Sequence, residues 1–237
     1  MASNPRQRPL RLFVVRHGQV AANREYRYVG DRDDPLTDLG RRQAAAIAEA
    51  LGSLRVEGRP LPVARLVSSP RQRARDTAYA IADAFGRELE IDERLAEQSY
   101  GGWEGLTRDE VRALSEEDAL HLERIDSDPT LAPPGGESLS AAQRRVVSLV
   151  DELAGGTTEG AVVLVSHVGP IKTLIAAALD LPLVNLRRLF LDLATLTVID
   201  WSQPPVLRLF NHHAHLGFDR ARWLESSRSE SPAPHPR

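Results

Sequence analysis

Short runs of apolar residues alternate along this chain with longer segments in which apolar residues recur at helical spacing. The apolar runs lie at Leu10–Val15, Ala64–Val67 and Ala161–Val165, and each is nearly continuous, as in a strand buried on both faces of a sheet. The periodic segments between them predict amphipathic helices that cover those faces. This order of elements predicts an α/β fold, a three-layer α/β/α sandwich with a mostly parallel central sheet and helices on both faces.

Cap residues and proline indicate where the helices begin. Thr37 and Ser138 are good N-caps, because a side-chain oxygen there accepts a backbone N–H that the first turn leaves without a partner. Pro70 suits the first turn of a helix. The four expected helices cover about residues 37–52, 70–85, 138–154 and 169–179.

Two further segments are expected in the sheet. Leu89–Ile91 alternates as an exposed or edge strand does. Leu189–Trp201 and Val206–Phe210 predict a terminal antiparallel hairpin.

The stretch at residues 98–137 differs from the rest, because it opens on a glycine-punctuated loop, continues as acidic helices and ends at Pro133–Gly136. We expect it to be an inserted helical lid that lies over the sheet edge and shapes a site. One domain is expected over residues 10–225, with a flexible N-terminus at 1–9 and a disordered tail at 226–237.

The composition excludes several classes of protein. The chain has 237 residues, no cysteine and a formal charge of −3, so it has no disulfide, thiolate metal site or cysteine nucleophile and lacks the basic excess of a nucleic-acid binder. No window approaches the length of an apolar membrane span, and the polar N-terminus has no signal-peptide core. We therefore expect a cytoplasmic protein that binds neither membrane nor nucleic acid. All basic residues except Lys172 are arginine, which indicates codon bias.

The candidate chemistry lies at the ends of the predicted strands. His17 and His167 each follow directly on an apolar run, and in a parallel sheet such strand ends meet at one edge, where ligands bind. Arg16 precedes the first histidine. Arg71, Arg73 and Arg75 follow the second strand, but at this spacing they cannot all point into one site. Two histidines with arginines near a helix N-terminus favour an anionic ligand such as a phosphate.

Four segments together resemble the motifs of the histidine phosphatase superfamily, the phosphoglycerate mutase-like fold. Val14–Gln19 is similar to the Arg-His-Gly signature, Ser68–Ala78 to the second-arginine motif, Leu95–Gly105 to the proton-donor segment and Val165–His167 to the second-histidine motif. They occur in the family's order, and the resemblance covers about residues 10–216. The continuation Val168-Gly169-Pro170 looks like actinobacterial domains of the α-ribazole phosphatase type.

The resemblance implies covalent catalysis through a phosphohistidine. His17 would be the nucleophile, and a backbone carbonyl near Gly18 would fix its tautomer. Arg16, Arg73 and a protonated His167 would stabilise the transferred phosphoryl group, and Glu97 would be the general acid and then the general base. No metal and no cofactor are needed, because arginine and histidine already supply the positive charge.

The resemblance also implies which further residues bind the phosphate. The expected set is Gly18, Gln19, Asn23, Arg27, Gly30 and Val168. Val20 departs from the family, which has threonine or serine there, so one hydroxyl donor to the phosphate is missing.

Two other features are not expected to take part in the chemistry. Lys172 fits a solvated position on the helix after His167. His212, His213 and His215 have no trusted metal-ligand spacing and fit a surface or the rim of the site.

Three functions remain open: a phosphatase of small phosphomonoesters, a phosphoglycerate mutase, and a non-catalytic module that binds phosphorylated ligands. The binding module is disfavoured because all the expected catalytic residue types are present. A mutase must hold a bisphosphate, which calls for extra cations over the site, but residues 98–137 carry three arginines against ten acidic residues. The sequence therefore favours hydrolysis of a small phosphorylated metabolite, and it is compatible with a homodimer.

Overall fold

A six-stranded sheet forms the centre of the computed structural model, which describes residues 9–156 and 159–217. Its strands are β1 (Leu10–Arg16), β4 (Val63–Ser68), β5 (Glu90–Ile91), β6 (Ala161–Ser166), β7 (Leu196–Trp201) and β8 (Val206–His212). In the order β5-β4-β6-β1-β7-β8, the first four strands run parallel and the last two are antiparallel to their neighbours. The expected fold class is confirmed. The expected flexible N-terminus, apart from residue 9, and the expected tail lie outside the described residues.

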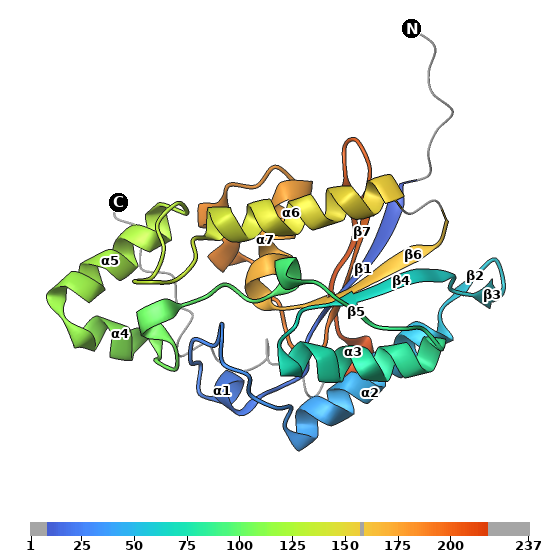
Figure 1. Ribbon diagram of the computed structural model, residues 1–237, viewed down its shortest axis with the longest axis horizontal. Coiled ribbons are helices and arrows are strands. Elements are labelled where there is room, and N and C mark those ends of the chain that lie inside the picture. The colour runs from blue at the N-terminus through green and yellow to red at the C-terminus, as the bar shows by residue number, and fades with distance from the viewer. Residues whose placement is uncertain (1–8, 157–158, 218–237) are drawn as a thin grey trace, which may run out of the picture.

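Helices cover both faces of this sheet, as Figure 1 shows. The larger ones are α2 (Asp38–Ser53), α3 (Gln72–Phe85), α6 (Leu139–Gly156) and α7 (Val168–Ala178). Because successive residues of a strand point to opposite faces, Leu12 and Val14 of β1 pack with α6 and α7, whereas Phe13 and Val15 pack with α2 and α3. The nearly continuous apolar runs in the sequence therefore reflect burial on both sides.

Two of the predicted helix starts are confirmed and one is wrong. Thr37 accepts the N–H of Gly40 at 3.0 Å, and Ser138 accepts the N–H of Ala141 at 3.2 Å. Helix α3 begins at Gln72 with Arg71 as its N-cap, so Pro70 lies before the helix and not in its first turn.

The two ends of the insertion lie side by side and are joined by hydrogen bonds. The N–H of Glu137 donates to the carbonyl of Ser99 at 2.9 Å, and the side chain of Gln98 donates to the carbonyl of Glu137 at 2.6 Å. Between these ends lie α4 (Arg108–Leu114) and α5 (Glu116–Ser127), packed around the buried Trp103.

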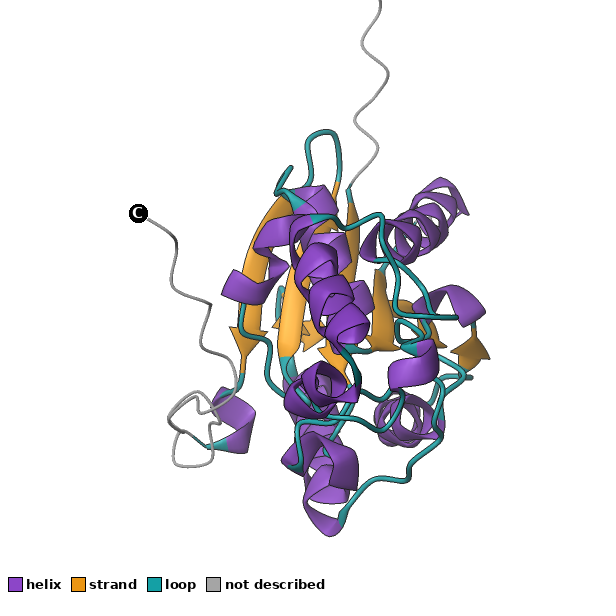
Figure 2. Ribbon diagram, turned by 90° about the vertical axis from the view of Figure 1, so that its left-hand side faces the viewer, coloured by secondary structure: helices purple, strands orange, loops and turns teal. Residues whose placement is uncertain are grey.

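This insertion lies beyond the carboxyl ends of the parallel strands and not along an edge strand (Figures 1 and 2). It is held there by the loop that follows the short helix α1 (Ala21–Arg24). Tyr28 donates its N–H to Leu106 at 2.8 Å, accepts the N–H of Gly105 at 2.9 Å and stacks on the ring of Tyr100. The inserted segment thus borders the end of the sheet where the predicted catalytic residues lie.

Three local features differ from the prediction. Helix α1 and the small hairpin of β2 (Arg55–Val56) and β3 (Arg59–Pro60) are not among the elements that the sequence predicts. The terminal hairpin is confirmed, but β7 begins at Leu196, because residues 189–195 form an irregular segment. No helix within the described ranges is long and apolar enough to span a membrane.

Candidate active site

Adjacent strand ends bring the two predicted histidines together. In the parallel pair of β1 and β6, Arg16 lies opposite Ser166, so His17 and His167 follow at the same level. Both side chains are buried, and their ring centroids are 4.9 Å apart at an angle of 57°. The residues after β4 approach the same point, since Ser69 Oγ lies 2.7 Å from Nε2 of His167.

The imidazole of His17 is oriented by its own neighbour. Its Nδ1 lies 2.7 Å from the carbonyl oxygen of Gly18, and because a carbonyl only accepts, Nδ1 carries the proton and Nε2 keeps its lone pair. Burial, followed by the charges of Arg73 and Arg16, lowers the pKa of His17 well below its ordinary value. His17 is therefore held neutral, with the lone pair of Nε2 available, as the predicted nucleophile requires.

His167 is neutral as well in this arrangement. Burial, then Arg73, then His17 and Arg16, lower its pKa well below the ordinary value. Its Nδ1 is buried and has no hydrogen-bond partner among the residues that the structure describes. The protonated His167 expected from the sequence thus requires a phosphoryl group, whose negative charge would offset the two arginines.

Backbone carbonyls hold the guanidinium groups of both arginines. Arg73 is 1% exposed, and Arg16 donates to the carbonyl of Leu191, which precedes β7. The acceptors of Arg73 are the carbonyl oxygens of Arg32 at 2.6 Å, Val29 at 3.1 Å and Gly30 at 3.1 Å. This arrangement keeps positive charge beside both histidines, as a site for a phosphoryl group requires.

Glu97 lies within this buried cluster. Desolvation raises the pKa of its carboxyl, against the opposing effects of the Gln98 N–H and the charges of Arg73 and Arg16. Oε1 accepts two backbone N–H bonds, from Gln98 at 2.9 Å and from Gly169 at 3.1 Å. A raised pKa is what a general acid needs in order to hold its proton near neutral pH.

Two glycines at the site make room for protein atoms. A Cβ on Gly169 would lie 2.4 Å from Oε1 of Glu97, and a Cβ on Gly18 would lie 2.5 Å from the carbonyl oxygen of Gly40 in α2. Gly169 therefore lets Glu97 approach the start of α7, and Gly18 lets the strand end approach α2.

Asn23 and Gly30 shape the loop after β1. Asn23 accepts the N–H of Val20 at 3.0 Å through Oδ1, which leaves its Nδ2 as the side-chain donor. Gly30 donates its N–H to the carboxylate of Glu104 at 3.0 Å, and its Cβ would collide with that carboxylate. Val20, at the position where the family has threonine or serine, packs in a small apolar cluster. The members of this cluster are Val20, Ala22, Val29, Leu36 and Ala44.

Arg27 is bound to carboxylates of its surroundings. It donates to Glu25 at 2.7 Å, to Glu110 of α4 at 2.6 Å and to the carbonyl of Gly105 at 2.8 Å. The structure thus uses Arg27 to join the loop after β1 to the insertion, and its contact with phosphate stays a prediction.

The remaining candidates lie around the site. Gln19 accepts the hydroxyl of Thr37 at 3.0 Å, Val168 is the first residue of α7, and Lys172 lies in the second turn of that helix. Of the three late histidines, the ring of His215 hydrogen-bonds the carbonyl of Ala194 at 2.8 Å. Within residues 9–156 and 159–217, no three histidine, aspartate or glutamate side chains gather as they would around a metal ion.

Two residues of the site carry no signal of their own in the sequence. Ser69 is one of two adjacent serines at a strand end, and only the fold shows that its hydroxyl reaches His167. Gln98 is one polar residue of a long polar segment, yet it is buried and holds the end of the insertion next to Glu97.

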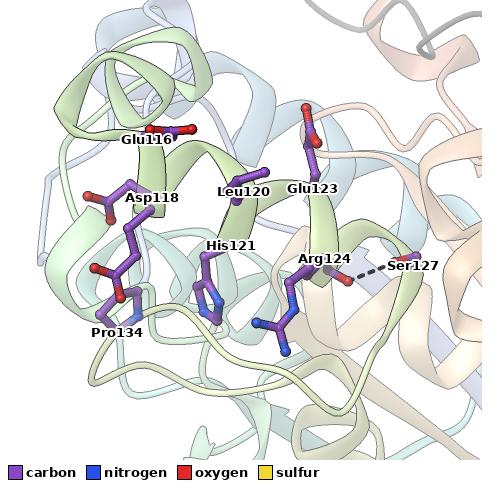
Figure 3. A pocket seen from close by; sticks show the side chains of 9 residues that line it. Glu116, Asp118, Leu120, His121, Glu123, Arg124, Ser127 and Pro134 are labelled. Atoms are coloured by element: carbon purple, nitrogen blue, oxygen red, sulfur yellow. Dashed lines mark hydrogen bonds between the residues drawn. The ribbon is translucent and has the colours of Figure 1, made fainter.

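The broad hollow in Figure 3 is separate from this cluster. It measures about 1030 Å³ and lies along α5. Its lining consists of Glu116, Glu117, Asp118, Leu120, His121, Glu123, Arg124, Ser127 and Pro134, so none of the catalytic candidates borders it. The excess of carboxylates makes it unsuited to a phosphorylated ligand.

A sheet whose carboxyl ends present two histidines, two buried arginines and a buried glutamic acid defines a phosphoryl-transfer site of the histidine phosphatase type. Residues 12–211 match the histidine phosphatase superfamily (branch 1), and the chain belongs to that family.

Individual relatives agree with this assignment. A bifunctional protein of Mycobacterium tuberculosis is 40% identical over 88% of this chain, which spans only 55% of that relative. A glucosyl-3-phosphoglycerate phosphatase of Mycolicibacterium vanbaalenii is 42% identical over 74% of this chain and 76% of its own length. The solved mycobacterial glucosyl-3-phosphoglycerate phosphatase in complex with VO3 is 35% identical, with a TM-score of 0.75 over 86% of this chain and 100% of that one.

Proposed function

We propose that this protein hydrolyses a small phosphomonoester through a phosphohistidine on Nε2 of His17. The observation that carries the proposal is the orientation of that ring. Its Nδ1–H is held by the Gly18 carbonyl, so the free lone pair belongs to a neutral nitrogen beside two arginines. A nucleophile of this kind divides a difficult hydrolysis into two easier displacements.

In the first displacement, Nε2 of His17 forms a bond to phosphorus, and the bond from phosphorus to the alcohol oxygen breaks. Glu97 transfers its proton to the leaving oxygen and becomes a carboxylate. Arg16 and Arg73 stabilise the charge spread over the phosphoryl oxygens, and His167 joins them once the phosphoryl group favours its protonated form.

In the second displacement, water attacks the phosphohistidine. The Glu97 carboxylate accepts a proton from this water, the bond from nitrogen to phosphorus breaks, and inorganic phosphate leaves. Both His17 and Glu97 return to their starting protonation states, so one cycle consumes one water molecule and one ester.

The substrate belongs to the small phosphorylated metabolites. We place it with phosphorylated hydroxy acids, because two of the similar proteins are named for glucosyl-3-phosphoglycerate. The acidic insertion supports hydrolysis over transfer to a second phosphorylated molecule, since two of its arginines are already paired with its own carboxylates. These pairs are Arg108 with Asp126 and Arg112 with Asp109.

The test is a labelling experiment on His17→Ala. We expect the wild-type protein to release phosphate from p-nitrophenyl phosphate and to yield an acid-labile phosphoenzyme on rapid quenching, and we expect His17→Ala to do neither. His212→Ala, a change at an exposed histidine, is the control and should retain both. Turnover by His17→Ala would overturn the proposal, as would efficient transfer from a bisphosphoglycerate to monophosphoglycerate in preference to water.

A further inference from the structure

Arg71 lies close to the proposed catalytic residues, although it has no role in the two displacements proposed for the reaction. It is the N-cap of α3, and its backbone N–H lies 3.3 Å from Oγ of Ser69, the same hydroxyl that lies 2.7 Å from Nε2 of His167. Its charge contributes to lowering the pKa of His167 and of Arg73. The side chain of Arg71 is therefore within electrostatic reach of the group that would bind phosphate.

The guanidinium of Arg71 is occupied by a carboxylate of the chain itself. Nη2 forms an ion pair with Oδ1 of Asp31, and Oδ2 of Asp31 accepts the hydroxyl of Ser99 at 2.5 Å. The side chains are 26% and 52% exposed, so solvent and ligands reach the pair. In addition, Nε of Arg71 is buried without a hydrogen-bond partner among the described residues. One donor of the guanidinium is thus left unused by the carboxylate that holds it.

All three partners in this contact adjoin catalytic groups. Asp31 lies between Gly30 and Arg32, whose carbonyls hold Arg73, and Ser99 comes two residues after Glu97. The pair therefore contacts both the segment that holds Arg73 and the segment that carries Glu97.

Arg75 provides an internal comparison. It lies one turn further along α3, and its contact with Asp33 is loose at 3.9 Å. Its backbone N–H donates to the carbonyl of Arg71 within the helix start, and its guanidinium faces Asp33 instead of Asp31. Of the two arginines that flank Arg73, Arg71 is therefore the one whose partner Asp31 also contacts Ser99, two residues after Glu97.

We propose that Arg71 binds a carboxylate of the substrate in exchange for Asp31, and that this exchange selects phosphomonoesters with a carboxylate close to the phosphoryl group. The planar guanidinium can pair with a substrate carboxylate in two parallel hydrogen bonds, whereas Asp31 accepts from it through Nη2. Asp31 keeps its bond to Ser99 when it is displaced. This inference rests on the proposed phosphatase function and specifies the class of its substrate.

Two esters that differ only at the carboxylate provide the test. 3-Phosphoglycerate and glycerol 3-phosphate share a primary phosphate ester, but the second carries a CH₂OH group in place of the carboxylate. We expect Arg71→Gln to lower kcat/KM for 3-phosphoglycerate about 10- to 100-fold more than for glycerol 3-phosphate, mostly through KM, which is the usual effect of losing a charged hydrogen bond. The control Arg75→Gln should leave the ratio of the two kcat/KM values unchanged.

Asp31→Asn should act in the opposite direction. It weakens the ion pair with Arg71 while its side-chain oxygen still accepts the hydroxyl of Ser99, so we expect it to raise kcat/KM for 3-phosphoglycerate relative to glycerol 3-phosphate. A gain in selectivity cannot come from a folding defect. Equal changes on both esters in Arg71→Gln, or an unchanged ratio in Asp31→Asn, would overturn the role of Arg71 while p-nitrophenyl phosphate is still hydrolysed. Failure of the wild-type protein on all three esters would overturn the phosphatase function itself.

Discussion

The protonation states of His17 and Glu97 are set in opposite directions by one shared environment. Burial disfavours the charged form of each group, so it lowers the pKa of His17 and raises the pKa of Glu97. The cations Arg16 and Arg73 add to the effect on the histidine and oppose the effect on the carboxyl. A neutral nucleophile and a protonated acid can therefore coexist, which is the combination that the first displacement needs.

The role of Glu97 can be tested through the leaving group. We expect Glu97→Gln to reduce kcat/KM about 10²- to 10⁴-fold on alkyl phosphates such as glycerol 3-phosphate, and much less on p-nitrophenyl phosphate, whose leaving group needs no proton. In the wild type, activity on the alkyl ester should fall as the pH rises through the raised pKa of Glu97, because the acid then loses its proton. The variant should lack this alkaline decline. Equal losses on the two substrates would exclude Glu97 as the general acid.

Gly169 offers a test that changes the position of Glu97 without substituting any of the proposed catalytic side chains. In Gly169→Ala the new Cβ would lie 2.4 Å from Oε1 of Glu97, so the carboxyl has to move. We expect the kcat on alkyl phosphates to fall about 10- to 100-fold, since a displacement of this kind misaligns the acid with the leaving oxygen. Steady-state kinetics on alkyl and aryl esters would measure it, and the aryl ester should be less affected.

Gly155→Ala is the matched control for that substitution. Gly155 lies near the end of α6, and a Cβ there meets nothing within 4 Å. This variant should keep full activity and gain a little stability, because alanine is the better helix former. If Gly169→Ala behaves in the same way, Glu97 does not need the position that the structure gives it.

At the scale of elements, the hydrophobic pattern predicts the strands and helices of the core well. Each of these elements buries one or two faces, so its burial repeats with the period of its backbone. The apolar residues Leu189, Leu191 and Leu193 break this rule, because Leu191 and Leu193 are buried in an irregular segment before β7. An apolar residue reports burial and not conformation, and for this reason β7 starts later than predicted.

Some residues of the site can be predicted from the sequence and others cannot, whereas the elements of the core are predicted well. Residues that end a core strand, such as His17 and His167, can be placed from the sequence, because the sheet itself brings them together. Ser69 and Asp31 act through side-chain contacts with residues far along the chain, and no local pattern encodes such contacts. The motif of Arg27 suggests phosphate, the fold pairs it with Glu25 and Glu110, and its contact with phosphate stays a prediction.

The irregular segment before β7 positions two catalytic residues. The carbonyl of Leu191 accepts from Arg16, and the N–H of Ala194 donates to the carbonyl of His17 at 3.1 Å. The same segment is also held by His215, whose ring nitrogen Nε2 forms a hydrogen bond of 2.8 Å with the carbonyl of Ala194. The C-terminal part of the described chain is therefore linked through Ala194 to the backbone of His17, the proposed nucleophile.

Removing that support should weaken phosphate binding. We expect His215→Ala to raise the inhibition constant of inorganic phosphate about tenfold, because the segment that contacts Arg16 and His17 is then held less firmly. The protein should remain folded at the assay temperature. His212→Ala is the control, because the exposed His212 stacks on the ring of His215, with centroids 6.0 Å apart, so this variant removes that ring contact and leaves the hydrogen bond to Ala194. Competitive inhibition by phosphate at fixed pH measures the effect. An unchanged inhibition constant with normal turnover would contradict the positioning role of His215.

At the scale of the whole molecule, charge is divided between two regions. Buried cations gather at the carboxyl ends of the strands, and the insertion beside them is acidic. Arginines of the insertion pair with its own carboxylates, as Arg108 does with Asp126. The net charge of −3 conceals this division. An anionic ester is thus attracted to the strand ends, and the acidic border limits how much further negative charge can bind nearby, which favours a monoester over a bisphosphate.

The buried carboxyl also affects the stability of the whole fold. Because burial raises the pKa of Glu97 above its ordinary value of 4.5, the folded state binds more protons than the unfolded state between those two values, and stability falls as the pH rises through this interval. Glutamine cannot ionise, and its oxygen still accepts from Gln98 and Gly169. We therefore expect Glu97→Gln to raise the Tm relative to the wild type, by a margin that is larger at pH 8 than at pH 5. Thermal unfolding at constant ionic strength measures the margin, and Glu88→Gln, at an exposed position, should show no such change with pH. A margin that stays constant or shrinks between pH 5 and pH 8 would mean that Glu97 is not held protonated by the fold.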